Sequence, residues 1–463
     1  MSTSEPPHLP DGLEEGDLLD ADDAAEEIAK DDDQPMDEDF DDLDEEEEIQ
    51  LQNDSVAHFD AHTDSIFCIA QHPTKPSIII TGGGDDVAYI FDASVPQAIS
   101  APGGERQSLA PLQKLDGHTD SVNASTFTLP QGKYVVTAGL DGKLRAWKND
   151  DGSGKRWTYL AEASEVQEIN WVAASPNPEH ENVVALGAND GSVWVYQINA
   201  DDQGSPLTIV QAYYLHTASC TAGAWTPDGN LLATVSEDGS LYVWDVFVTG
   251  QAVVTCTAGD ARFEVEGGLY SVACTSSLVA VGGAGGHIRV VGLPQPADQS
   301  KKNAKGAGAS RQPASSAGQL LAALQAQADG VETLSFSSPP LNILAAGSVD
   351  GSIALFDTAH RFALRRHIKE AHEDYAVVKV DFVRNPQRGG WLLTSVGMDG
   401  VVRRWDVRGG TTAAGQGFLQ EWRGHRGEGE GGGILGFVQG GGGSRIVTAG
   451  DDGIALVFQA DIA

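Results

Sequence analysis

The sequence predicts an all-β fold in which eight similar units close into a ring. The main observation is a recurring spacing, in which an aspartate is followed six residues later by a large aromatic residue. Seven clear copies run from Asp85 to Phe91, Asp141 to Trp147, Asp190 to Tyr196, Asp238 to Trp244, Asp350 to Phe356, Asp399 to Trp405 and Asp452 to Phe458. An eighth copy, Gly285 to Val291, keeps the strand pattern but not the two marker residues. A repeat of this length indicates one unit of secondary structure copied around a ring.

Within each unit, short runs that alternate apolar and polar residues predict antiparallel strands. Residues 134–138 and 231–235 are such runs, and turn residues such as Pro227-Asp228-Gly229 separate neighbouring runs. Successive markers lie 47 to 65 residues apart, which exceeds the roughly 40 to 45 residues of a minimal four-stranded blade. Each unit is therefore predicted to be a four-stranded blade with extended loops.

The start of the chain differs from the rest in its charge. Residues 1–50 contain 23 Asp and Glu and one basic residue, Lys30, which is a net charge of −22 out of −38 for the whole chain. Like charge at this density, with few large apolar side chains, cannot bury enough surface to offset the loss of chain entropy. We therefore predict a disordered acidic tail over residues 1–52.

Residues 53–463 are predicted to form the ring. The last unit ends soon after the strand predicted at 454–458, so its outermost strand is missing from the C-terminal end. Residues 54–60, which precede the first full unit, can supply that strand, join the two ends of the chain in one sheet and leave no open edge. Between the fifth and sixth units, residues 293–318 are rich in Ala, Gly, Ser, Pro and Lys, a composition that predicts a flexible insertion.

Sets of His, Ser or Thr, Asp and Trp recur at matched positions in the units. They are His118, Thr137, Asp141, Trp147; His216, Thr234, Asp238, Trp244; His372, Ser395, Asp399, Trp405; and, ending in Phe, His62, Thr81, Asp85, Phe91 and His425, Thr448, Asp452, Phe458. A catalytic triad has no reason to be copied in each unit, whereas a buried hydrogen-bond network does. The sequence also contains neither a phosphate-binding loop nor metal-ligand spacing. We therefore expect no enzyme, no metal and no cofactor.

The Gly-His start, Asp-Gly turn and Trp-Asp end of the units, as in Trp244-Asp245 and Trp405-Asp406, resemble the WD-repeat family. This resemblance implies an eight-bladed β-propeller from about residue 54 to 463. The acidic run 44–48, residues 59–67 and Gly82-Gly83-Gly84-Asp85-Asp86 are similar to the fungal WD-repeat ribosome-assembly chaperones and their animal relative, angio-associated migratory cell protein. What this implies is a dedicated chaperone that captures the basic N-terminal segment of a newly made large-subunit ribosomal protein and supports its delivery to the 60S subunit.

In WD propellers, the ligand face is usually built by the loop before the innermost strand of each blade and by the residue before the turn aspartate. On this chain, these places and the aromatic residues near them hold the candidate partner-binding residues Asp64, Phe67, Asp120, Glu168, Glu237, Tyr270, Glu332, Asp374, Tyr375 and Asp451. A carboxylate accepts both arms of an arginine fork, and an aromatic ring stacks on the guanidinium plane. An acidic face of this kind can stand in for the ribosomal RNA that a basic client lacks before assembly.

The strong negative charge favours a basic protein as the partner. A phosphate backbone needs a basic footprint, so we expect no direct contact with nucleic acid. No apolar run approaches the roughly 18 residues of a membrane span, and the four cysteines lack metal or C-x-x-C spacing. We therefore expect a cytoplasmic protein, present also in the nucleus, that acts as a monomer.

Two alternatives stay open at the level of the sequence. Several other WD-repeat proteins bind basic partners, so a chaperone of histones or of other basic proteins belongs to the same physical class. In addition, Trp405-Asp406-Val407-Arg408 resembles the motif by which substrate receptors dock to cullin-type ubiquitin ligases. The proteins that copurify with the tagged chain separate these alternatives.

Overall fold

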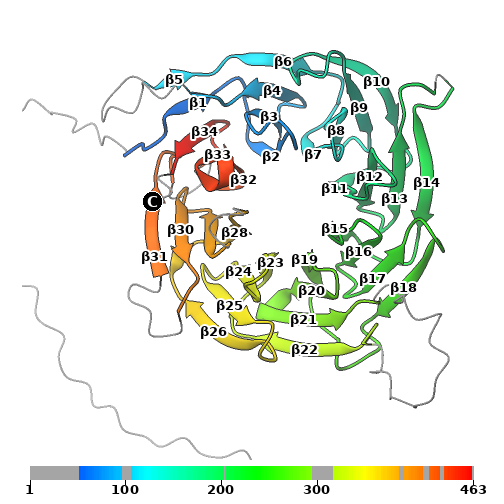
Figure 1. Ribbon diagram of the computed structural model, residues 1–463, viewed down its shortest axis with the longest axis vertical. Helices are drawn as coiled ribbons and strands as arrows, with labels where there is room; N and C mark the ends of the chain where they lie inside the picture. Colours follow the sequence, from blue (N-terminus) through cyan, green and yellow to red (C-terminus); the bar gives the residue numbers. More distant parts are fainter. Residues whose placement is uncertain are drawn as a thin grey trace, which may run out of the picture. The chain divides into compact units, whose positions relative to one another are not determined.

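Figure 1 shows the computed structural model, in which β-sheets are arranged as blades around a ring. The structure describes residues 52–95, 106–202, 204–294, 316–384, 390–409, 417–427 and 432–460. The predicted acidic tail, except for its last residue, lies outside these ranges, as does most of the insertion predicted at 293–318. In the part of the chain that is described, no helix is both long and apolar enough to cross a membrane.

The described residues form eight sheets, each ordered from the centre of the ring outward. Blade 1 consists of β2 (Ile66–Gln71), β3 (Ile78–Gly83), β4 (Ala88–Asp92) and β6 (Pro111–Leu115). Blades 2 to 4 consist of β7 (Val122–Phe127), β8 (Tyr134–Gly139), β9 (Leu144–Asn149) and β10 (Trp157–Ala163); β11 (Ile169–Ala174), β12 (Val183–Ala188), β13 (Val193–Ile198) and β14 (Leu207–Tyr213); β15 (Cys220–Trp225), β16 (Leu231–Ser236), β17 (Leu241–Asp245) and β18 (Gln251–Cys256).

Blades 5 to 7 repeat this order. They consist of β19 (Leu269–Cys274), β20 (Leu278–Gly283), β21 (His287–Gly292) and β22 (Leu320–Gln325); β23 (Val331–Phe336), β24 (Ile343–Ser348), β25 (Ile353–Asp357) and β26 (Ala363–Ile368); β28 (Val377–Phe382), β29 (Leu392–Gly397), β30 (Val402–Asp406) and β31 (Phe418–Trp422). Blade 8 contains β32 (Ile434–Gly440), β33 (Arg445–Gly450) and β34 (Ala455–Gln459). The predicted all-β, eight-bladed propeller is confirmed.

Blade 8 is completed by the N-terminal part of the chain, as the sequence predicts. Strand β1 (Ala57–Phe59) pairs antiparallel with β34, and Ala57 faces Val457 across the ladder. The Phe59 ring stacks on the Phe91 ring at a centroid distance of 4.3 Å, which links this strand to blade 1. A short fifth strand, β5 (Gln107–Ser108), adds to β1 in parallel and covers its outer edge. The sequence pattern does not predict β5, because two residues are too few to show a periodicity.

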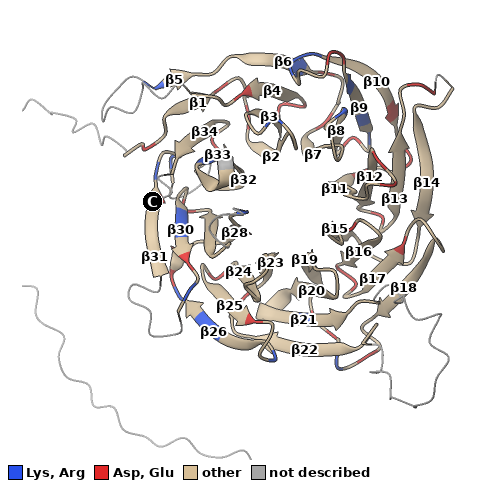
Figure 2. Cartoon of the chain, viewed as in Figure 1, with Lys and Arg blue, Asp and Glu red and all other residues tan. Residues whose placement is uncertain are grey.

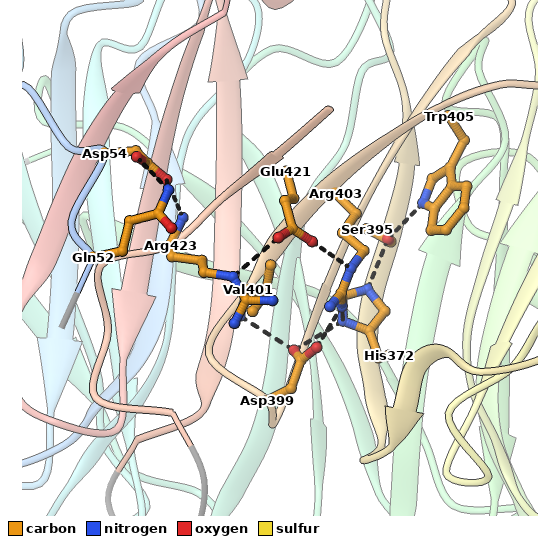
Figure 3. Close-up of polar contacts among 10 residues, drawn as sticks. All are labelled: Gln52, Asp54, His372, Ser395, Asp399, Val401, Arg403, Trp405, Glu421 and Arg423. Atoms are coloured by element: carbon orange, nitrogen blue, oxygen red, sulfur yellow. Dashed lines mark hydrogen bonds and ion pairs between the residues drawn. The ribbon is translucent and has the colours of Figure 1, made fainter. Parts of the chain in front are cut away.

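A chain of polar contacts anchors the closing segment on blade 7 (Figure 3). The Asp54 N–H donates to the Arg423 carbonyl at 2.7 Å, and the Arg423 N–H donates to the Asp54 carboxylate at 2.8 Å. The Arg423 guanidinium donates to Glu421 at 3.0 Å, and Glu421 also pairs with Arg403 at 3.3 Å. Arg403 in turn pairs with Asp399, the turn aspartate of blade 7. The N-terminal closure is therefore coupled to the interior of a neighbouring blade.

The second strand of each blade lies between its two neighbouring blades rather than at a surface. All six residues of β8 are buried, although residues 134–138 alternate in the sequence. Each face of a blade packs flat on the next blade, as where Ile80 and Ile90 of blade 1 form one cluster with Val122 and Val135 of blade 2. Both faces of a central strand are thus buried. The alternation of residues in its sequence distinguishes the two faces that pack on the two neighbouring blades, and not a solvent-exposed face from a buried one.

The ends of the predicted insertion are part of the fold. Leu293 is buried in the apolar cluster of blades 4 and 5, and its N–H donates to the Ser277 carbonyl at 2.8 Å. Ala317 forms a β-bridge with Gly292. The prediction of a flexible segment over 293–318 is therefore too wide, because Leu293 and Ala317 continue the sheet on either side of it.

Four blades contain the histidine network in its direct form, and a fifth contains a variant of it. In blade 1, His62 Nδ1 lies 2.9 Å from Asp85 Oδ1, and His62 Nε2 lies 3.0 Å from Thr81 Oγ1. The equivalent bonds occur at His118, His372 and His425. All of these histidines are buried, so the network ties the loop before the innermost strand to the second strand and to the turn that follows it.

Blade 4 builds the network in a different way from the prediction. His216 Nδ1 lies 2.6 Å from the Ser240 hydroxyl and 3.9 Å from Asp238. Ser240 in turn bonds Asp238 at 2.5 Å. The serine that follows the Asp-Gly turn therefore stands between the histidine and the aspartate, and the expected direct contact is absent from this blade.

Candidate functional site

One backbone hydrogen bond is repeated in all eight blades and defines a single face of the ring. In each blade, the residue before the turn aspartate, or before Gly285 in blade 5, donates its N–H to the carbonyl of the residue before the innermost strand, at 2.9 to 3.2 Å. The donor–acceptor pairs are Gly84–Ser65, Leu140–Ser121, Asn189–Glu168, Glu237–Ser219, Ala284–Gly268, Val349–Gly330, Met398–Ala376 and Asp451–Gly433. We call the side of the ring that carries these pairs the upper face.

The innermost strand of every blade has a β-bulge at its second residue, which is two residues after the carbonyl that accepts this bond. The pairing shifts register between the first and third residues of the strand, so the second residue has no partner on the next strand. These bulge residues are Phe67, Asn123, Asn170, Thr221, Tyr270, Glu332, Val378 and Leu435. A bulge re-aims a side chain out of the regular ladder, so the fold presents one redirected side chain per blade near the upper face.

The bulge residues of blades 2 to 4 hold neighbouring blades together. The side chains of Asn123, Asn170 and Thr221 each donate to a carbonyl of the next innermost strand, at 2.7, 3.0 and 2.6 Å respectively. Phe67 in blade 1 is instead 40% exposed. Glu332 in blade 6 is exposed, and its carboxylate has no Lys or Arg partner among the described residues. The ring therefore uses three of these eight positions to join neighbouring blades, and it leaves Phe67 and Glu332 exposed on the upper face.

The structure places all ten predicted site residues on the upper face. Phe67, Tyr270 and Glu332 are bulge residues, and Glu237 and Asp451 are donors of the repeated backbone bond. The other five, Asp64, Asp120, Glu168, Asp374 and Tyr375, lie in the segments just before an innermost strand. Asp374 differs from the expectation of a loop in that it ends a short strand, β27 (Ala371–Asp374). The part that these residues take in binding stays a prediction.

Some of the predicted residues are brought into contact. A β-carbon at Gly84 would lie 3.0 Å from Asp64 Cγ and 3.3 Å from Phe67 Cε2, so the glycine lets an acid and an aromatic ring approach each other. The carboxylate of Asp451 accepts a hydrogen bond from Ser65 at 2.6 Å, which joins blade 8 to blade 1. Glu332 lies beside Tyr270, as described below. For Asp120 and Glu168, the structure gives no contact with another of the ten.

Sequence reasoning missed one acidic residue on this face, Asp329. Its Oδ1 accepts the N–H of the next residue, Gly330, at 2.7 Å. Asp64 and Asp120 make the same bond at 2.7 and 2.8 Å, and all three stand two residues before an innermost strand. The position of Asp329 two residues before the strand is thus the sequence feature that could have predicted it. Blade 6 has two acidic residues near the start of its innermost strand, Asp329 and Glu332, and only Glu332 was among the candidates.

Charge is distributed unevenly around the ring (Figure 2). From Trp157 to Ala261 the sequence contains 13 Asp and Glu and no Lys or Arg, and Figure 2 shows no blue from β11 to β18. Basic residues gather instead on β9, β26 and β30. Blades 3 and 4 therefore contribute only acidic charged residues to the ring, and these carboxylates can attract a basic ligand.

Burial and like charge act on the acids near blade 6. Although the Glu332 side chain is exposed, neighbouring atoms remove part of the water around its carboxyl, and this partial desolvation, together with the negative charge of Asp329, raises its pKa above the usual value. Burial followed by the charges of Glu332, Glu237 and Asp329 raises the pKa of Tyr270. Like charge is the second cause of both shifts, and an incoming positive group would relieve this repulsion. In the described residues, no three His, Cys, Asp or Glu side chains are grouped so as to hold a metal.

Comparison with known proteins identifies the family. The model described as "WD domain, G-beta repeat" matches residues 53–92, 109–148 and 207–245. The chain is 29% identical over 451 residues to the ribosome assembly protein SQT1 of Saccharomyces cerevisiae, which covers 93% of this chain and 91% of the relative. It is 26% identical over 419 residues to human angio-associated migratory cell protein, covering 88% and 80% respectively.

Solved structures extend this likeness to the whole ring. The crystal structure of Sqt1 from Chaetomium thermophilum matches with a TM-score of 0.78 and 51% sequence identity, over 89% of this chain and 99% of that chain. The same protein bound to the N-terminus of the ribosomal protein L10 matches with a TM-score of 0.77 at 51% identity, over 88% and 100%. The resemblance that the sequence motifs indicated is confirmed: this chain belongs to the Sqt1 family of WD-repeat ribosome assembly proteins.

Proposed function

We propose that this chain is a dedicated chaperone that captures the basic N-terminal segment of the ribosomal protein L10 on its upper face and supports delivery of that protein to the 60S subunit. The observation that carries the proposal is the crystal structure of a 51% identical relative with this segment bound. The acidic upper face of this chain provides the matching chemistry, because carboxylates pair with Arg and Lys side chains.

The proposed action is binding rather than catalysis. The His, Asp and Thr or Ser sets that resemble catalytic triads are buried and are repeated in five blades. Their hydrogen bonds stabilise each blade, which leaves no unrepeated acid–base pair among them. We propose that the protein does this work as a monomer in the cytoplasm, where ribosomal proteins are made, and that it also enters the nucleus.

The ubiquitin-ligase alternative draws no support from the motif that suggested it. The Arg408 guanidinium donates to Asp406 Oδ1 at 3.0 Å and to Asp406 Oδ2 at 2.5 Å, and it lies 4.8 Å from the centre of the Trp391 ring. The arginine thus has a structural partner within its own blade.

Charge reversal on the upper face tests the proposed function. We expect the Glu237→Lys, Glu332→Lys double variant to bind a synthetic peptide of the L10 N-terminal segment at least about tenfold more weakly, which corresponds to roughly 1.4 kcal/mol. Isothermal titration calorimetry measures the change. Both residues are exposed, so the melting temperature should stay the same.

The matched control is Glu181→Lys. Glu181 is also exposed, but it lies between β11 and β12, at the end of the blade opposite to the upper face. This variant changes the net charge in the same direction and should keep most of the affinity. Undiminished binding in the double variant would remove the upper face as the site, and equal losses in both variants would reduce the effect to net charge.

A further inference from the structure

Tyr270 occupies a fixed position at the edge of blade 5. It is the bulge residue of β19 and is half-buried. Its hydroxyl donates to the Gly267 carbonyl in the loop just before the strand. A ring that is held at its backbone by a bulge and at its hydroxyl by a hydrogen bond has little freedom to turn away. It can therefore present a preformed aromatic surface.

Carboxylates of both neighbouring blades act electrostatically on this ring, and one of them, Glu332, lies beside it. The charges of Glu332, Glu237 and Asp329 all act on the Tyr270 hydroxyl. A β-carbon at Gly330 would lie 3.3 Å from Glu332 Oε1 and 3.8 Å from Tyr270 Cδ2, which places that carboxylate beside the ring. None of the three acids pairs with a Lys or Arg among the described residues. This part of the upper face thus combines an aromatic surface with unpaired negative charge.

Small residues surround the ring and leave it uncovered. The loop before β19 contains Gly267 and Gly268, at positions where blades 1 and 2 have an aspartate and a serine. Gly268 has φ +95° and a β-carbon there would lie 2.8 Å from the Glu237 carbonyl oxygen, so only glycine permits this approach of blade 4 to the loop. Ala284 supplies the repeated backbone bond without a long side chain. The two loop residues that directly precede β19 and the residue that makes the repeated backbone bond therefore place no long side chain over Tyr270.

An aromatic ring beside several carboxylates suits a guanidinium better than an ammonium. The planar guanidinium stacks on the ring and donates in its plane to carboxylates on more than one side, whereas an ammonium is a compact point charge that gives up its hydration less readily. We propose that Tyr270, Glu237, Asp329 and Glu332 form a subsite that takes one arginine of the basic client and distinguishes it from lysine. This inference rests on the proposed function and adds a residue preference to it.

The test uses the full chain and a set of L10 N-terminal peptides in which each arginine is replaced, one at a time, by lysine. Net charge is the same in every peptide. For wild type, we expect one replacement to weaken binding about tenfold and to stand out from the others. In Tyr270→Leu that penalty should fall to about twofold or less, while Tyr270→Phe, which keeps the ring, should retain most of it.

A second pair of variants does not depend on the ring. Asp329→Asn keeps the Oδ1 bond to the Gly330 N–H but removes the charge, and Asp120→Asn does the same to the equivalent bond in blade 2. We expect Asp329→Asn to lower the arginine-to-lysine affinity ratio at the selected peptide position and Asp120→Asn to leave the ratio unchanged.

The possible results distinguish a failure of the proposed arginine subsite from a failure of the proposed chaperone function. If wild type binds the peptide but shows no selective arginine position, or if Tyr270→Leu and Asp329→Asn both keep the full ratio, the subsite is wrong and the chaperone function stands. If wild type does not bind the peptide at all, both proposals fail. Equal changes of the ratio in Asp329→Asn and Asp120→Asn would also overturn the subsite, because they would spread the preference over the whole face.

Discussion

At the scale of single residues, the positions of the histidine network hold a complete polar set in five blades. Blades 5 and 6 have other residues at these positions. Blade 6 has Gln327 in the histidine position, and its amide donates to the Ser352 carbonyl at 2.9 Å and lies 3.1 Å from the Ser352 hydroxyl. In blade 5, the positions of the histidine, of the threonine or serine and of the aromatic residue hold Val265, Val281 and Val291, which belong to one apolar cluster. Blade 5 thus leaves no buried polar group at these positions, whereas in blade 6 the Gln327 amide nitrogen is bonded but its Oε1 is buried without a hydrogen-bond partner.

The buried histidines make the stability of the ring sensitive to acid. Burial lowers the pKa of His216 to about 4, and burial also lowers the pKa of His62, His118 and His372 below the ordinary 6.5. The folded state therefore keeps these rings neutral, while the unfolded chain takes up protons below about pH 6.5. Their contribution to stability is complete above that pH and is lost as the pH falls from about 6.5 toward 4.

We expect the urea midpoint to be lower at pH 5 than at pH 7. His216→Gln should reduce this difference by on the order of 1 to 2 kcal/mol in unfolding free energy, because glutamine does not titrate. Blade 6 shows that glutamine fits this position beside a serine. Equilibrium urea unfolding at the two pH values measures the effect. An unchanged pH difference in His216→Gln would contradict the assignment of the buried neutral histidine.

Removal of a whole histidine network has a separate expected effect. His372 is fully buried and lies 2.9 Å from Asp399 and 2.8 Å from Ser395. His372→Ala should lower the free energy of unfolding by about 1 to 3 kcal/mol, mainly because its partners are left unpaired. His360→Ala is the control, since the His360 side chain is 80% exposed. Equal stability of the two variants at pH 7 would argue against a structural role for the network.

At the scale of elements, the sequence predicts the strands well and their local irregularities poorly. Repeated spacing predicts every blade, even blade 5, because strand alternation survives where the marker residues do not. The bulge in each innermost strand leaves no signal in one sequence, since it arises from the geometry of the ring and tolerates residues as different as Phe67 and Leu435. The acidic residues of the candidate site could be placed on one face by spacing alone, but their contacts depend on these bulges and on glycines such as Gly84.

The closing strand gives a prediction at this scale. The reference is a deletion of residues 1–51, which keeps the described contacts of the closing segment from Gln52 and Asn53 onward. Deletion of residues 1–60 removes β1 as well and should lower the melting temperature by several degrees, since Ala57 and Phe59 are both completely buried. Differential scanning calorimetry on the two deletions makes the comparison. Equal melting temperatures would show that β1 does not hold the ring closed.

At the scale of the whole molecule, charge rather than shape separates this ring from a generic scaffold. The sequence predicts this property directly, because net charge is a sum over residues and needs no coordinates. The sequence also shows that blades 3 and 4 lack basic residues while β26 and β30 contain them, because each blade is a contiguous segment. It does not show which side chains of neighbouring blades meet, since that depends on how the blades pack.

Binding of the basic peptide should therefore depend strongly on salt. We expect the affinity to fall by about tenfold or more between 50 and 300 mM NaCl, because added ions screen the attraction between exposed charges. The association rate should account for much of this change, and stopped-flow fluorescence with a labelled peptide measures it. A rate that does not vary with salt would leave electrostatic steering without support. Glu181→Lys, measured in parallel, shows how much of the effect comes from net charge alone.

The pairing of β1 with β34 also orders events during the synthesis of the protein itself. The two strands come from opposite ends of the chain, so the sheet that contains both cannot form until residues 455–459 have left the ribosomal exit tunnel. Until then seven blades can assemble in turn, but the circle stays open between the first and the last. A translation arrest near residue 450 would accordingly leave a chain that has neither β34 nor the upper-face residue Asp451, so the pairing with β1 that closes the ring could not form.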